Sequence, residues 1–126
     1  MEMRSHLGRA RGLGASNDGV HHWWAQRLTG LALVPLALWF VFSVVGLVGA
    51  DLATFQAWVG HHGNPVLLIL LTICMFHHAQ LGLQVVIEDY VHCEKIKVVS
   101  VVLIKFAAAL LGACCIFAVL RLTFGG

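Results

Sequence analysis

The sequence predicts an all-α membrane protein with three transmembrane helices. Hydrophobic residues make up 60% of its 126 residues, charged residues make up only 11%, and the mean hydropathy is +0.87. No Lys or Arg occurs over residues 28–94, and residues 52–87 carry no formal charge of either sign. These runs exceed the roughly 18 to 20 apolar residues that are needed to cross a bilayer. The length leaves room for one small domain, so chemistry on soluble substrates requires a partner.

The three apolar segments are expected at about residues 25–50, 65–90 and 96–123. Each segment is hydrophobic on all sides rather than along one stripe, which is typical of helices that face lipid or one another. We therefore expect residues 1–24 to form a cytoplasmic N-terminal tail and residues 25–126 to form one three-helix transmembrane anchor domain.

The basic residues indicate how the chain is oriented. Five of the eight Lys and Arg residues fall in the N-terminal tail and in the loop after the second segment: Arg4, Arg9, Arg11, Lys95 and Lys97. The loop after the first segment, residues 51–64, has neither Lys nor Arg. The positive-inside rule then places the N-terminus and the second loop in the cytoplasm.

Four cysteines raise the question of a metal or disulfide framework. Three lie inside the expected spans and one lies in the second loop, and no pair forms a CxxC or CxxCH pattern: Cys74, Cys93, Cys114 and Cys115. The pattern does not support thiolate clusters or covalent haem attachment, and favours packing as small apolar side chains.

Two adjacent histidines stand deep in the second segment. His77 and His78 follow its start by about a dozen residues, or roughly 18 Å at 1.5 Å per residue, which is near the middle of the membrane. An imidazole at this depth can hydrogen-bond a neighbouring helix, relay protons or bind a metal such as haem iron. Neighbours on a helix point about 100° apart, so at most one of the pair faces a given cofactor. The other is expected to have an ordinary hydrogen-bonding role.

An acidic residue and a tyrosine end the same segment. Asp89 and Tyr90 follow His78 by about 16 to 18 Å along a helix, at the cytoplasmic membrane surface. A tyrosine donates a hydrogen bond to a carbonyl, and a carboxylate beside it supplies protons, so the pair suits a quinone head group. The alternative is an acidic helix end with a tyrosine of the interfacial aromatic belt.

Two motifs resemble the membrane-anchor D subunit, the cytochrome b556 small subunit, of succinate dehydrogenase, which is respiratory complex II. The first comprises Gly19-Val20-His21 and Arg27-Leu28-Thr29. The second is His78-Ala79-Gln80-Leu81-Gly82-Leu83-Gln84-Val85, followed by Asp89-Tyr90-Val91. The chain length, the three spans and the inferred orientation agree with that family.

The resemblance implies a role for several residues. His78 corresponds to one axial ligand of haem b, and the partner C subunit supplies the second histidine. Arg27, and more weakly His21, correspond to the haem propionate region, where a guanidinium suits a carboxylate. Tyr90 and Asp89 correspond to the ubiquinone site. No catalytic residue for succinate oxidation is expected in this chain.

The implied function is that of a multi-pass anchor in the bacterial cytoplasmic membrane. Succinate is oxidised on a flavoprotein subunit that holds FAD, and electrons pass through the iron–sulfur clusters of a second subunit to ubiquinone. The anchor forms a helix bundle with the C subunit, shares haem b with it and contacts membrane lipid. No nucleic-acid partner is expected.

Two other functions remain open at this point. One is a haem-free membrane assembly or transport subunit that uses His77 and His78 for metal or protons. The other is the anchor of a different quinone-linked cytochrome b. The chain departs from the family pattern at His77 and Glu88, and Lys105 in the third segment has no assigned role. The quinone type, the haem potential, the need for haem in turnover and the oligomeric state also stay open.

Overall fold

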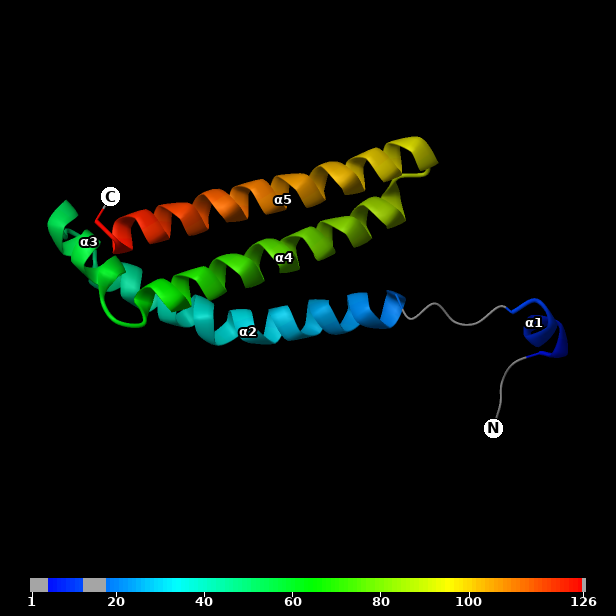
Figure 1. The fold of residues 1–126 in the computed structure, drawn as a ribbon, viewed down its shortest axis with the longest axis horizontal. Coiled ribbons are helices and arrows are strands. Elements are labelled where there is room, and N and C mark those ends of the chain that lie inside the picture. The colour runs from blue at the N-terminus through cyan, green and yellow to red at the C-terminus, as the bar shows by residue number, and fades with distance from the viewer. Residues whose placement is uncertain (1–4, 13–17, 126) are drawn as a thin grey trace.

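The structure, a computed structural model, describes residues 5–12 and 18–125, without the side chains of residues 9 and 18. This part of the chain contains helices and no strands. In order, the elements are α1 His6–Ala10, α2 Asp18–Gly46, α3 Leu52–Gly60, α4 Asn64–Tyr90 and α5 Glu94–Thr123 (Figure 1).

Three of these helices are long and apolar enough to cross a membrane. The helices α2, α4 and α5 contain 29, 27 and 30 residues. At about 1.5 Å per residue, each is longer than the roughly 30 Å hydrocarbon core of a bilayer. The predicted fold class, an all-α protein with three transmembrane helices, is confirmed.

Helix α4 lies between α2 and α5 and contacts both of them (Figure 1). In the described part of the chain, α2 and α5 do not contact each other. The three helices therefore form a layer with two open faces, and large apolar side chains such as Phe42 and Phe106 stay more than two-thirds exposed. Such a surface needs lipid or another subunit to cover it.

The short helix α3 was not predicted, because residues 51–64 were expected to form a loop. Asp51 caps this helix, and its Oδ1 accepts a hydrogen bond of 2.9 Å from the Thr54 backbone N–H. Hydrogen bonding to Thr54 lowers the pKa of Asp51 below its ordinary value. Trp58 of α3 stacks on Trp39 of α2 with the ring centres 5.9 Å apart, so α3 packs against the end of the layer.

The helix ends also refine the expected spans. Helix α2 covers Asp18–Gly46, beside an expected span of about 25–50, whereas α4 and α5 match their expected ranges closely. His21 and His22 are therefore helical. Of the expected N-terminal tail, residues 1–4, Arg4 among them, and residues 13–17 lie outside the described residues.

Candidate functional site

His78 lies on the side of α4 that faces α2. The imidazole is half-buried, and its Nδ1 lies 3.1 Å from Oγ1 of Thr29 on α2. The Thr29 hydroxyl also lies 2.6 Å from the backbone carbonyl of Ala25, which can only accept a hydrogen bond. Because a hydroxyl has one proton, Thr29 donates to Ala25 and accepts from the Nδ1–H of His78. This tautomer leaves the lone pair of His78 Nε2 available to a metal ion.

Gly30 lets the imidazole approach the α2 backbone. A Cβ atom at this position would lie 3.1 Å from Cε1 and 3.6 Å from Nδ1 of His78, and the first of these distances is tighter than ordinary van der Waals contact. In the sequence, Thr29 stands out only as part of a motif, and no feature indicates that Gly30 meets His78. Both contacts join residues almost fifty positions apart.

Gly82 lies four residues after His78, one turn along α4. A Cβ there would lie 3.6 Å from Nε2 of Gln26, which is an ordinary contact distance. The Oε1 atom of Gln26 is buried and has no hydrogen-bond partner among the described residues. The α2–α4 interface near His78 therefore contains a polar atom that still needs a donor.

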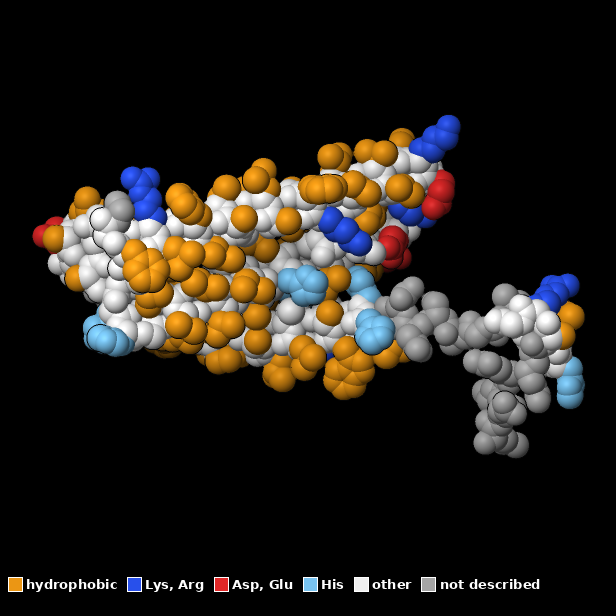
Figure 2. Space-filling view, viewed as in Figure 1, with side chains coloured by type: hydrophobic (Ala, Val, Ile, Leu, Met, Phe, Trp, Pro, Cys, Tyr) orange, Lys and Arg blue, Asp and Glu red, His pale blue; other side chains and the backbone are white. Residues whose placement is uncertain are grey.

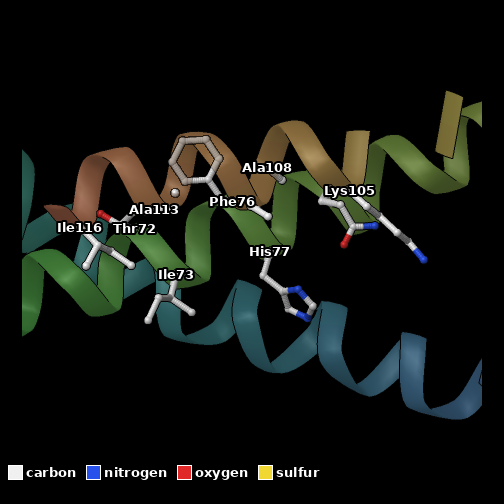
Figure 3. A pocket seen from close by; sticks show the side chains of 11 residues that line it. Thr72, Ile73, Phe76, His77, Lys105, Ala108, Ala113 and Ile116 are labelled. Carbon is white, nitrogen blue, oxygen red and sulfur yellow. The ribbon is translucent and has the colours of Figure 1, made fainter. Parts of the chain in front are cut away.

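His77 lies about 100° from His78 around α4. Its ring projects beside α4, where it lines a pocket together with Gln80 of α4 and Lys105 of α5 (Figure 3). The described residues provide no hydrogen bond to its ring. Of the two neighbouring histidines, only His78 is hydrogen-bonded to α2 in the described part of the chain.

The two residues predicted near haem propionates are on the surface of α2. The Arg27 guanidinium lies 5.6 Å from the centre of the Trp23 ring, in a cation–π contact. Arg27 and His21 are both exposed, and neither hydrogen-bonds His78 within the described part of the chain. The structure of this single chain thus does not bring them to His78.

Asp89 and Tyr90 are the last two residues of α4. The Tyr90 side chain is 77% exposed, and Asp89 is also exposed. No hydrogen bond joins the two side chains in the described structure. A phenol and a carboxylate are therefore both presented at the helix end, separate from His78.

The described residues contain no group of three or more His, Cys, Asp and Glu side chains that could hold a metal ion. His78 can contribute one nitrogen ligand, so further ligands have to come from another chain or from a cofactor.

Comparisons with known proteins give a consistent result. The family described as succinate dehydrogenase/fumarate reductase transmembrane subunit matches residues 1–120. A succinate dehydrogenase hydrophobic membrane anchor subunit from Rickettsia bellii is 30% identical over 109 residues, covering 86% of this chain and 87% of that protein. A succinate dehydrogenase membrane anchor subunit from Reclinomonas americana is 32% identical over 97 residues, covering 74% of this chain and 80% of that protein. No solved structure matches the chain significantly.

Proposed function

Because this chain belongs to the succinate dehydrogenase/fumarate reductase transmembrane subunit family, we propose that it anchors succinate dehydrogenase to a membrane and contributes to its haem and quinone sites. Three membrane-length helices with few buried side chains suit an anchor that is completed by other subunits. The most direct structural support is the hydrogen bond between His78 and Thr29, because it prepares one imidazole nitrogen for a metal.

His78 Nε2 is proposed to be one axial ligand of haem b. The fit rests on two features of this chain: Thr29 holds the Nδ1–H, and Gly30 leaves the space that the ring occupies. A hydrogen bond to the second ring nitrogen fixes the tautomer and raises the basicity of a ligating histidine. A partner anchor C subunit would supply the second histidine. When bound, the haem supplies a one-electron redox centre inside the membrane.

Arg27 is proposed to pair with a haem propionate, and His21 is a second candidate for that region. Arg27 is exposed, its guanidinium lies over the Trp23 ring, and it forms no ion pair in the described structure, so its hydrogen-bond donors are available to a carboxylate.

Tyr90 and Asp89 are proposed to form this chain's part of a ubiquinone site. The Tyr90 hydroxyl would donate a hydrogen bond to a quinone carbonyl, and the Asp89 carboxylate would pass protons from water to the reduced oxygen. Their exposure at the end of α4 supports this role, since a quinone that gains two protons needs a connection to water.

The remaining parts of the proposal concern the assembly. Succinate would be oxidised on a flavoprotein subunit with FAD, and an iron–sulfur subunit would deliver electrons to quinone. The positive-inside rule supports a cytoplasmic N-terminus in a bacterial cytoplasmic membrane. The residues that oxidise succinate would lie on those other chains.

One purification tests the proposal. The tagged chain is extracted from its native membrane in mild detergent, and its co-purifying proteins, visible spectrum and succinate:quinone activity are measured. The proposal predicts a flavoprotein, an iron–sulfur protein, a second anchor chain and a b-type haem band. A preparation with these three subunits but without haem would contradict the haem site alone, and a preparation without them would contradict the anchor role.

A further inference from the structure

A polar groove opens on one face of the helix layer. Its polar side chains come from all three long helices: His22 of α2, His77, Gln80, Gln84 and Glu88 of α4, and Lys105 of α5. The cavity has a volume of about 510 Å³. Figure 2 shows histidine, basic and acidic side chains gathered on this face, beside an otherwise apolar surface. The proposed haem and quinone sites use none of these six residues.

A ladder of side-chain hydrogen bonds orders the α4 wall of the groove. Gln80 Nε2 donates to Gln84 Oε1 at 3.1 Å, and Gln84 Nε2 donates to Glu88 Oε1 at 2.8 Å. Residues four apart on a helix lie on one face, so the ladder runs along the groove. It fixes the Glu88 carboxylate at the end nearest the α4–α5 loop.

Two nitrogen groups in the groove have no partner within the described chain. Lys105 forms no ion pair within 4.0 Å, and the ion pair found in this part of the chain joins Lys97 to Glu94. The Nε2 atom of His22 is buried without a hydrogen-bond partner. A lysine in a transmembrane helix pairs with an opposite charge or extends its ammonium to the interface, and an anionic lipid phosphate offers both.

The depth of Lys105 matches the level of lipid head groups. Its side chain extends from α5 toward the α4–α5 loop (Figure 3). Helix α5 exceeds the roughly 30 Å hydrocarbon core, and Lys105 lies about 16 Å from its first residue at 1.5 Å per residue. With α5 centred in the bilayer, its Cα is about 9 Å below the interface, and the long side chain brings the ammonium near the phosphate and ester region.

The groove becomes apolar on the side away from that loop. A second cavity of about 350 Å³ shares His77, Gln80 and Lys105 with the first. Its other walls include Ile73, Phe76, Ala108, Gly112 and Ile116. A Cβ at Gly112 would lie 3.6 Å from the Phe76 ring, so the ring packs close to this buried glycine and forms part of the apolar wall. Polar and apolar halves in this order match a phospholipid head group and its acyl chain.

The groove also lies on a different face from the proposed haem and quinone sites. At about 100° per residue, Glu88 lies about 20° from His77 around α4. His78 lies about 100° from His77, and Tyr90 lies about 140° from it. This step depends on the proposed function, because it assumes that the C subunit covers the sides of α4 that carry His78 and Tyr90, which lie about 120° apart. The groove then faces the lipid of the bilayer.

We propose that this groove binds one membrane phospholipid that has a primary ammonium in its head group, as phosphatidylethanolamine does. The phosphate lies against Lys105 and His22, the head-group ammonium lies against Glu88, and an acyl chain follows Phe76 and Gly112. The Glu88 carboxylate disfavours a purely anionic head group, because like charges repel. A lipid of this kind compensates both charges of the groove.

The test counts lipids on the intact assembly. The complex is purified in mild detergent and equilibrated with micelles that contain equal amounts of phosphatidylethanolamine and phosphatidylglycerol. Lipid retained after washing is measured by native mass spectrometry for wild type, Lys105→Met and Glu88→Gln. Lys95→Met is the matched control, because it removes the same charge at an exposed position outside the groove.

Wild type and Lys95→Met should retain one phosphatidylethanolamine per chain. Lys105→Met should lower this retention by about tenfold, as expected for the loss of one charge-assisted hydrogen bond. Glu88→Gln should remove the preference over phosphatidylglycerol. Equal retention by wild type and Lys105→Met, or a wild type without retained lipid because protein fills the groove, would overturn the proposal. Visible spectra of the same samples judge the haem site separately.

Discussion

Replacing Thr29 with valine tests the link between α2 and the proposed haem ligand. Valine keeps the shape of threonine but removes the hydroxyl that lies 3.1 Å from His78 Nδ1. Loss of such an outer hydrogen bond typically weakens metal binding by about 10- to 100-fold. This range corresponds to about 1.4 to 2.7 kcal/mol of binding free energy. The helix packing should change little, because Gly30 and its contact with the ring remain.

The assay is the rate at which the detergent-purified complex loses haem to excess apomyoglobin. Thr29→Val should lose haem faster than wild type, and its reduced spectrum should shift because the imidazole is no longer held in one orientation. Thr29→Ser retains a hydroxyl and serves as the control. Equal rates of haem loss from Thr29→Val and wild type would refute the positioning role. Haem loss from Thr29→Ser that is as fast as from Thr29→Val would refute it too.

Three further changes probe separate parts of the chain. Tyr90→Phe should keep the haem spectrum but slow quinone reduction by about five- to tenfold, the usual worth of one hydrogen bond; unchanged quinone kinetics would exclude Tyr90 from the site. Gly30→Ala places a Cβ 3.1 Å from His78 Cε1 and should lower stability by about 1 to 3 kcal/mol through overpacking. Its thermal unfolding is compared with that of Gly46→Ala, where no atom lies within 4 Å of the added Cβ. The lowered pKa of Asp51 means that the ionised cap stabilises α3 at neutral pH, and this stabilisation is lost as the pH falls below about 3.8. Amide exchange in α3 should then accelerate in wild type. The same pH response in Asp51→Asn as in wild type would contradict this.

Much of the fold was predictable because the length and hydrophobicity of the uncharged runs indicate transmembrane helices. Uncharged runs longer than a bilayer crossing form helices, since an unpaired backbone group in lipid is too costly. Helix α3 was missed because its nine residues lie between two spans, in a segment read as a loop. Asp51, which caps its first turn, and the apolar residues after it were the available signal.

The site was predictable only in part. The spacing from His78 to Tyr90 follows from the geometry of one helix, and the structure retains it. The contacts of His78 with Thr29 and Gly30 depend on how α4 packs against α2, which no pattern within either segment specifies. The four-residue spacing of Gln80, Gln84 and Glu88 was a visible signal for one polar face. Its closeness to Lys105 required the structure.

The most direct measurement of the central claim is a reduced-minus-oxidised visible spectrum of two complexes that carry His78→Ala or His77→Ala. The two residues are adjacent and equally deep in α4, but only His78 contacts Thr29. We expect the b-type haem band to be lost or altered in His78→Ala and to remain in His77→Ala, with all subunits present in both. A normal haem band in His78→Ala would contradict the proposed ligand, and loss of the band only in His77→Ala would move the ligand to the neighbouring residue.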